Sequence, residues 1–440
     1  METSKKFILL ALTVLGLGLL FGILGTLQYV FPGFLKAAVS FEKTRPLHVS
    51  SVVFWIILAA VGVVQHYLNE HFKNNAKYPV LVKIQFWMFL SAIPIIMVSY
   101  LMGVFGGREY WEFPPVLALP IVIGWIAFLI HFFTSVRQLT KQPVYVWMWL
   151  TGIVFFLITF LESYLWLIPY FRQNIIGDMT VQWKSYGSMV GSWNMLIYGS
   201  GIYLMDKISE DNKSSSSVTA FLIYSLGLFN LLFNWGHHIY SLPTAPYIRY
   251  VSYAVSMTEL LLFGKIIYQW KSSLSAAKKY RHEVPYKFLL AADIWVFIML
   301  GQAIVMSIPA FNLYTHGTHV TVAHSMGTTI GINSMLLMAF VYDIFGNTKQ
   351  QFIKPKLFKK GYFLINASLL VFWLSLMTAG ILRAAWQMNE KQNAFSQMMS
   401  SLTPFFISFS VSGFTLAIGF YILFRHLYVT NRSKWIHNEA

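Results

Sequence analysis

The side chains best suited to chemistry in this sequence are imidazoles. Cysteine is absent, which excludes thiolate metal ligands, iron–sulfur clusters and covalently attached haem c on this chain. His237 and His238 are adjacent and follow Gly236. Consecutive helical residues point about 100° apart, so the two can hold one metal only near a helix end or distortion, and Gly236 offers such a place. The pair therefore predicts two metal ligands, although polar residues also collect at helix ends because water is near.

A second segment concentrates possible ligands within twelve residues. It runs from Thr315 to Met326 and contains His316, His319 and His324. Residues two apart on a helix differ by about 200°, so His324 and Met326 point to opposite sides. Methionine is a known axial haem ligand that raises the haem potential. Each of these two side chains could then serve a different haem, or Met326 could simply pack.

Composition indicates which elements must hold these residues. The 440 residues are 57% hydrophobic and only 11% charged, against roughly 45–50% and 25% in soluble domains. These values exclude an ordinary soluble enzyme, a coiled coil and a disordered chain. A membrane helix needs about 20 mostly apolar residues. We find twelve such stretches in one integral membrane domain over residues 1–440, and they begin near Phe7, His48, Ile84, Val116, Tyr145, Trp183, Val218, Tyr247, Lys287, Thr318, Lys360 and Ser401.

Basic residues predict the orientation of this bundle. Of the 32 Lys and Arg residues, 22 lie at the two termini and in the loops that follow even-numbered stretches. Because such residues are retained on the cytoplasmic side, both termini are expected to be cytoplasmic in a bacterial inner membrane. His48 and the two histidine segments then lie toward the outer leaflet, at one depth. The net charge of +16 is explained by this bias and by lipid attraction, so no nucleic-acid partner is expected.

The order of motifs resembles a known family. The runs 27–30 and 45–48, the Gly236-His237-His238 segment, the run 256–259 and the stretch 315–324 look like the haem-bearing subunit of respiratory nitric oxide reductases. These proteins belong to the haem-copper oxidase superfamily, near its C-type branch. The resemblance spans nearly the whole chain and implies an all-α membrane protein, with the twelve-transmembrane-helix bundle of haem-copper oxidase subunit I.

The resemblance also implies roles for individual residues. His48 is similar to an axial ligand of a low-spin haem b, and His324 to the proximal ligand of a high-spin haem b. His237 and His238 resemble ligands of a neighbouring non-haem iron (or copper). Glu259 matches the buried glutamate of nitric oxide reductases, as metal ligand or proton relay; a structural carboxylate is the alternative, although an ionisable group deep in a membrane helix is costly. Two further residues, His316 and His319, are expected beside haem propionates.

Two departures from the family pattern change these expectations. Met326 stands where the family has a second histidine, so a low-spin haem ligated by His48 and Met326 is expected. In the sixth helix, Tyr186 or Gly187 stands where a third histidine should complete the metal site. Val190 or Gly191 replaces the family's glutamate one turn later. Two imidazoles with a carboxylate suit iron better than copper.

The implied function is a nitric oxide reductase-like oxidoreductase. Two nitric oxide molecules would be reduced to nitrous oxide with electrons relayed through the low-spin haem. A small membrane-anchored cytochrome c subunit is the expected donor, because the chain lacks the cysteines for haem c. Three alternatives stay open: nitric oxide dismutation to dinitrogen and dioxygen, terminal oxidase-like dioxygen reduction in which Tyr186 imitates a catalytic tyrosine, and non-catalytic gas binding.

The His48/Met326 ligation leads to a spectroscopic prediction. Replacing Met326 by histidine should lower the potential of the low-spin haem, because a thioether ligand favours the reduced iron. A redox titration should show this shift, and the far-red absorption band from thioether to iron should disappear while the haem content stays constant. An unchanged spectrum would contradict the assignment.

Overall fold

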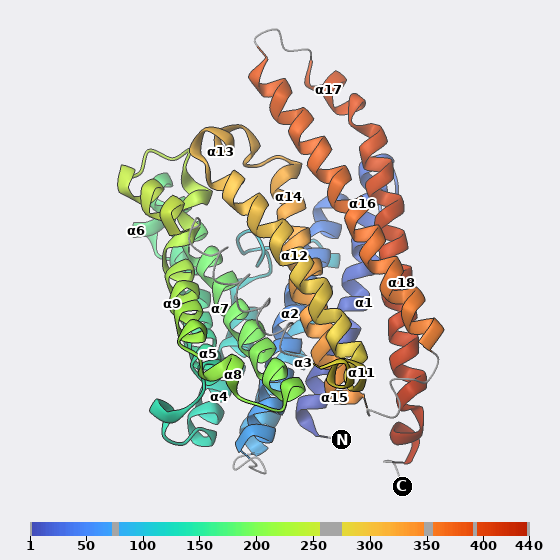
Figure 1. Cartoon of the computed structure of the whole chain (residues 1–440). Helices are drawn as coiled ribbons and strands as arrows, with labels where there is room; N and C mark the ends of the chain where they lie inside the picture. The colour runs from blue at the N-terminus through green and yellow to red at the C-terminus, as the bar shows by residue number, and fades with distance from the viewer. Residues whose placement is uncertain (1, 73–78, 256–274, 347–354, 390–393, 438–440) are drawn as a thin grey trace.

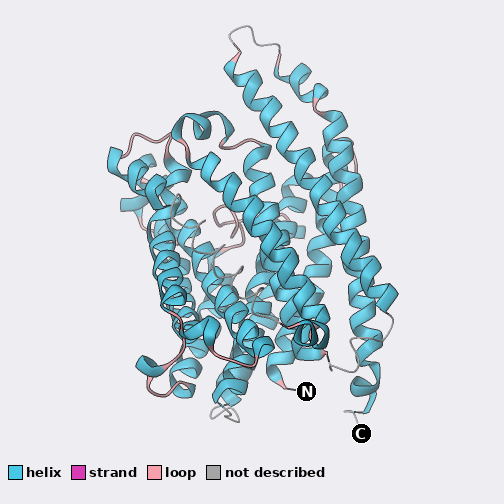
Figure 2. Cartoon of the chain, viewed as in Figure 1, coloured by secondary structure: helices cyan, strands magenta, loops and turns pink. Residues whose placement is uncertain are grey.

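The computed structural model describes residues 2–72, 79–255, 275–346, 355–389 and 394–437. Within these ranges the chain is helical and has no strand (Figure 2). The long helices run side by side, and α1 begins at the same end of the bundle at which α18 ends (Figure 1). The long helices are α1 (Thr3–Val30), α2 (Phe41–Phe72), α3 (Pro79–Leu101), α4 (Ala118–Ser135), α5 (Val144–Glu162), α7 (Ile175–Ser209), α9 (Val218–Phe233), α12 (Glu283–Ser307), α15 (Met335–Phe345), α16 (Pro355–Met388) and α18 (Thr403–His437).

Short elements connect the long ones. They lie mostly at the turns between spans, and two of them, η4 and α14, contain the histidine segments. The short elements are η1 (Pro115–Leu117), η2 (Leu139–Lys141), η3 (Leu165–Leu167), α6 (Pro169–Arg172), α8 (Lys213–Ser216), η4 (Asn234–Ile239), α11 (Ala276–Arg281), α13 (Pro309–Thr315), α14 (His319–Met326), η5 (Gly327–Ser334) and α17 (Phe395–Ser401).

Ten of the described helical stretches are long and apolar enough to cross a membrane. Of the two other expected stretches, the one near Tyr247 is helical over residues 246–255 and then leaves the described part of the chain. The second is α7, a 35-residue helix that carries charged side chains. Two of these charges are paired within the fold, since Asp178 accepts from Arg108 at 2.6 Å and Lys207 donates to Asp343 at 2.9 Å. A helix with partners for its charges need not be apolar.

The helices that carry the predicted haem ligands lie at the centre. In the most apolar stretch of α2, 83% of the residues are buried. In the most apolar stretch of the helix from His319 to Phe345, 72% are buried. The Nε1–H group of Trp55 on α2 donates to Ser334 Oγ at 3.0 Å, which ties the two together. The flanking helices bury a smaller share and present apolar side chains outward, as lipid-facing helices do.

The helix after His324 contains a wide turn. It is continuous from α14 to α15, but η5 (Gly327–Ser334) has π-helical geometry, with each turn closed one residue later than in an α-helix. Glycines let this turn lie against α12: a Cβ at Gly327 would lie 2.1 Å from Met299 Sδ, and one at Gly331 would lie 2.4 Å from Trp295 Cγ. Such turns occur often at functional sites.

Small residues also set the spacing of α5 and α7. A Cβ at Gly152 would lie 2.6 Å from the carbonyl oxygen of Ser192. We therefore expect Gly152→Ala to push the helices apart and to cost about 1–3 kcal/mol of stability. Thermal unfolding in detergent, followed by circular dichroism, should show a lower midpoint. The control is Gly201→Ala on α7, where a Cβ meets no atom within 4 Å. Equal midpoints for the two variants would contradict this packing.

Candidate metal centre

The adjacent histidines lie just beyond a helix end. The α-helix α9 stops at Phe233, and the chain continues as the tighter 3-10 turn η4, which contains His237 and His238. Their ring centroids are 4.1 Å apart. A Cβ at Gly236 would lie 3.2 Å from the carbonyl oxygen of Ile248, so this glycine permits a close approach between η4 and the following helical segment. The pair thus lies in a local distortion at the end of α9.

Two other segments meet this pair. The Trp183 ring on α7 stacks on His238 with centroids 4.9 Å apart and planes within 9°. The His316 ring lies 5.7 Å from His238 and 6.0 Å from Trp183. Asn312 on α13 donates from Nδ2 to the carbonyl oxygen of His237 at 3.2 Å. Sequence reasoning missed the contribution of Trp183, because an aromatic residue in an apolar helix is ordinary.

Several buried imidazole nitrogens in this cluster lack a hydrogen-bond partner. They are His238 Nδ1, His316 Nε2 and His324 Nδ1. The rings of His316 and His324 both lie within electrostatic range of His238. Burial lowers the pKa of His316 below its ordinary value, so this imidazole is neutral at neutral pH and keeps a lone pair for a metal.

The donor chemistry of this cluster fits a metal ion, because imidazoles suit iron, copper and zinc. Unpaired nitrogens in a buried cluster also carry a free-energy penalty that a bound ion would remove. Among the residues that the structure describes, however, no three His, Asp or Glu side chains already stand together at coordinating distances. Some ring rotation must therefore accompany binding. Glu259 lies outside the described residues.

His324 and Met326 have different neighbours. His324 lies within electrostatic range of His238. The Met326 side chain instead packs on the apolar cluster that contains Phe372 of α16 and Phe406 of α18. The short helix α14 thus stands between two environments.

His48 lies on α2 against α1. Its Nδ1–H group donates to the carbonyl oxygen of Gly18 at 2.8 Å. This bond fixes the tautomer and leaves the Nε2 lone pair available to a metal, as is usual for ligating histidines. A Cβ at Gly22 would lie 2.9 Å from both Nδ1 and Cε1 of His48, so the glycine provides the room for this ring.

His316 and His319 are separated, although both were expected beside haem propionates. His316 belongs to the cluster with His238. His319 packs against Tyr29 of α1 at 6.1 Å and Phe406 of α18 at 5.1 Å between ring centroids. The Nδ1 atom of His319 is buried without a hydrogen-bond partner. The two histidines therefore face different sides of the bundle.

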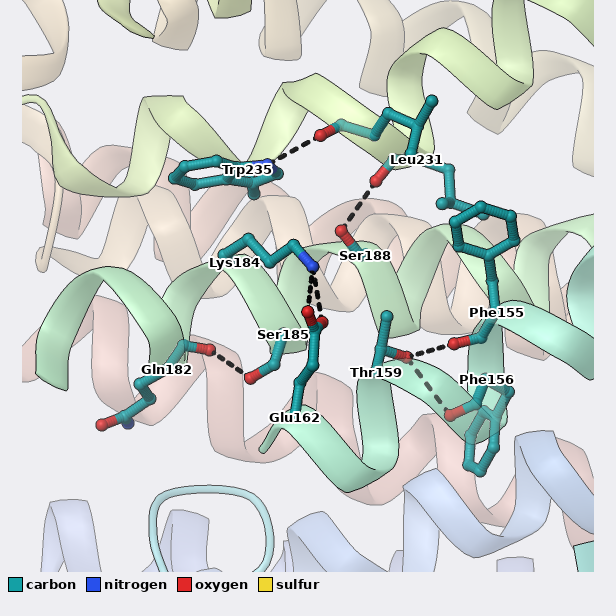
Figure 3. A network of polar contacts seen from close by, with 11 residues as sticks. Phe155, Phe156, Thr159, Glu162, Gln182, Lys184, Ser185, Ser188, Leu231 and Trp235 are labelled. Carbon is teal, nitrogen blue, oxygen red and sulfur yellow. Dashed lines mark hydrogen bonds and ion pairs between the residues drawn. The ribbon is translucent and has the colours of Figure 1, made fainter. Parts of the chain in front are cut away.

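α7 is the helix that was expected to supply a third ligand. It presents glycines to the end of α9 and to η4, the turn that contains His237 and His238. A Cβ at Gly187 would lie 2.7 Å from Trp235 Cβ, and one at Gly191 would lie 3.0 Å from Leu231 Cα. The Ser188 hydroxyl donates to the carbonyl oxygen of Leu231 at 2.7 Å (Figure 3). These contacts hold α7 directly against α9 and η4.

The neighbouring side chains of α7 point elsewhere. Tyr186 is buried and packs edge-on against Tyr110, with ring centroids 5.3 Å apart. Lys184 pairs with the carboxylate of Glu162 at the end of α5 (Figure 3). The sequence did not indicate this ion pair, because its partners are 22 residues apart.

Comparison with known proteins places this arrangement in a wider group. The family model described as cytochrome C and quinol oxidase polypeptide I matches residues 2–415. A nitric oxide reductase subunit from Stutzerimonas stutzeri is 22% identical and aligns over 94% of this chain and 92% of its own length. Cytochrome c oxidase subunit 1 of Rhodobacter capsulatus is also 22% identical, over 94% of this chain and 82% of the relative.

A solved structure supports the fold. The cryo-EM structure of a heme-copper terminal oxidase dimer matches with a TM-score of 0.76 at 17% identity, over 98% of this chain and 83% of that chain. The expected all-helical bundle of the haem-copper oxidase subunit I type is thereby confirmed. Of the twelve expected spans, ten correspond to described helices that are long and apolar enough to cross a membrane.

The contact between Gly22 and His48 gives a prediction for haem binding. Gly22→Val should push the His48 ring away and remove one of the two expected haems, since the added side chain would overlap the imidazole. A pyridine haemochrome assay on the purified protein would measure this loss. Gly16→Val on the same helix is the control, because a Cβ there meets no atom within 4 Å. Equal haem contents would count against His48 as a ligand.

Proposed function

The chain belongs to the cytochrome c and quinol oxidase polypeptide I family, and from this premise we propose that it is the catalytic subunit of a nitric oxide reductase-like enzyme. The family consists of membrane oxidoreductases that bind haems and an iron or copper centre. Within it, the reaction proposed for this chain is the reduction of two nitric oxide molecules, with two electrons and two protons, to nitrous oxide and water.

One observation carries this choice over dioxygen reduction. The His238 and His316 rings lie 5.7 Å apart, whereas α7 contributes Trp183, Gly187, Ser188 and Gly191 to its contacts with α9 and η4. An oxidase-type copper site would add a tyrosine from this region of the chain, whereas Tyr186 packs on Tyr110. The third imidazole does not separate the two reactions, because nitric oxide reductases also take a histidine from this helix. Two imidazoles with the carboxylate of Glu259 would suit iron better than copper.

The residues have distinct proposed roles. His48 and Met326 would hold the low-spin haem b, and His324 the high-spin haem b. His237 and His238 would hold the non-haem iron, with Glu259 as a further ligand or proton relay. When bound, the haems would relay electrons, and the metals would act as Lewis acids toward the two nitric oxide molecules. The chain's own part is to fix geometry: Trp183 fixes the ring plane of His238, and Asn312 anchors the backbone of His237.

Electron delivery is proposed from the outer side. α1 ends and α2 begins at the end of the bundle opposite the termini, where α13 also lies (Figure 1). With cytoplasmic termini in a bacterial inner membrane, this end faces outward, toward a membrane-anchored cytochrome c subunit. Nitric oxide would enter through the apolar lipid phase.

Nitric oxide dismutation is the second candidate. The absence of an α7 ligand at Gly187 and Gly191 favours it, because an altered ligand set on this helix distinguishes the dismutases that resemble nitric oxide reductases. Dismutation consumes no electrons from a donor. The two reactions therefore differ in their products and in their need for a reductant.

Gas analysis with isotopically labelled nitric oxide should decide between them. We expect the purified protein to release labelled nitrous oxide only when a reduced donor is present, with two electrons consumed per product molecule. Labelled dinitrogen and dioxygen without a donor would instead identify a dismutase. A spectral change on nitric oxide binding without any product would leave a gas-binding haem protein and refute the proposal.

A further inference from the structure

We propose that the end of the bundle remote from the histidine cluster holds a binding site for a small primary alkylammonium ion. The site is a cavity of about 390 Å³ beside the last turns of α2 and α7. Asp206 in this cavity and Trp183 beside His238 are 23 residues apart on α7, which is roughly 35 Å along the helix. The side chains that carry the argument are His71, Tyr145, Tyr203, Asp206, Glu210 and Asp211.

This cavity lies at the end of the bundle that contains the amino terminus. Near the end of α2, His66 pairs with Glu2 at 3.4 Å, and Asn69 donates to the same carboxylate at 3.2 Å. His71 follows on the same helix. With the expected cytoplasmic termini, a ligand would therefore enter from the cytoplasm.

Three aromatic rings from three helices form one wall of the cavity. His71 of α2, Tyr145 of α5 and Tyr203 of α7 stand nearly perpendicular to one another, with angles of 88°, 83° and 88° and centroids 5.2–6.4 Å apart. The Tyr145 hydroxyl lies 3.0 Å from His71 Nδ1, which holds two of the rings together. Such a corner of rings suits an ammonium group, because the ring quadrupole attracts cations.

Asp206 supplies an anionic group to the same cavity. Its side chain is only 6% exposed. The Oδ1 atom accepts from the backbone N–H of Ser214 at 3.1 Å, and Ser215 also lies beside the carboxylate. The Oδ2 atom is buried and has no hydrogen-bond partner within the described part of the chain. A buried acceptor without a donor is costly, and an ammonium N–H would remove this penalty.

The balance of charge around the cavity also favours a cation. Two groups of ion pairs offset each other, since one has an extra carboxylate and the other an extra basic group: Lys207 with Glu70 and Asp343, and Glu210 with Lys278 and Arg281. Asp206 and Asp211 are outside both groups. Asp211 accepts from the backbone N–H of Lys213 at 3.1 Å. The two aspartates thus give the cavity an excess of negative charge.

The available donors suit an ammonium ion better than a metal ion. Among the described residues, no three His, Asp or Glu side chains stand together so that they could hold a metal. A primary ammonium needs fewer acceptors and can lie against aromatic rings. It also carries the N–H donors that Asp206 Oδ2 requires, which a fully methylated ammonium lacks. The volume is at the small end of ligand pockets, roughly 300–1,000 Å³, so the ligand should be short.

Calorimetric titration of the purified full chain in detergent tests this proposal. The probe is 1,4-diaminobutane, and the control ligands are 1,4-butanediol, which is uncharged, and tetramethylammonium, which has no N–H donor. The variant Asp206→Asn removes the charge and keeps an oxygen for the Ser214 N–H. The control variant is Glu42→Gln, which removes one charge from the first turn of α2, whereas His71 lies in its last turn.

We expect saturable binding of 1,4-diaminobutane to the unchanged protein. Asp206→Asn should bind it at least about tenfold more weakly, because a charge-assisted hydrogen bond is lost. Glu42→Gln should match the unchanged protein, since its charge lies several Debye lengths away. Tetramethylammonium should bind at least about tenfold more weakly than the diamine, and butanediol should not bind. If Asp206→Asn is poorly folded, the comparison of the three ligands on the unchanged protein decides.

The proposal is wrong if the unchanged protein shows no saturable diamine binding, or if Asp206→Asn binds the diamine with full affinity. A lipid headgroup could supply the same ammonium, so the titration is repeated in nanodiscs of phosphatidylglycerol with and without phosphatidylethanolamine. Weaker diamine binding in the presence of phosphatidylethanolamine would support the site with the lipid as its occupant. Equal binding would support a free amine. Because the cavity is remote from the histidine cluster, the proposed function is tested separately by the gas analysis.

Discussion

The close approach of α7 to the segment formed by α9 and η4 determines the shape of the candidate centre. Gly187 and Gly191 permit this approach, and Trp235 occupies the space that a side chain at position 187 would need. The same contact brings Trp183 flat against His238. A helix that comes this near can supply an aromatic wall but not a ligand beside the histidine pair.

Ion pairs join the same helix to its neighbours. The charged side chains of α7 lie toward its two ends, and residues 185–205 carry none. The pairs are Arg108–Asp178, Glu162–Lys184 and Lys207–Asp343. Unpaired charges next to lipid are costly, so these partners stabilise a helix that carries charge in an apolar bundle. The histidine cluster therefore lies beside a helix held by ion pairs as well as by packing.

Hydropathy and spacing predicted much of this architecture, and their failures have physical causes. Twelve spans were predicted because lipid-facing helices must be apolar. Ten described helices are long and apolar enough, and α7, the stretch expected near Trp183, is less apolar because it carries paired charges. The helix end at His237 and the opposite environments of His324 and Met326 follow from the angle between helical residues. The contacts of Trp183 and His316 with His238 were not predictable, because they join segments more than fifty residues apart.

The wide turn at Gly327–Ser334 sets the rotation between the two halves of one membrane helix. One residue more per turn rotates everything on its amino-terminal side by about 100° relative to an uninterrupted α-helix. His324 lies on the amino-terminal side of this turn, and the hydrogen bond from Trp55 to Ser334 holds the carboxy-terminal side. Deleting one residue between them would therefore turn the His324 imidazole by about 100° relative to the rest of the helix.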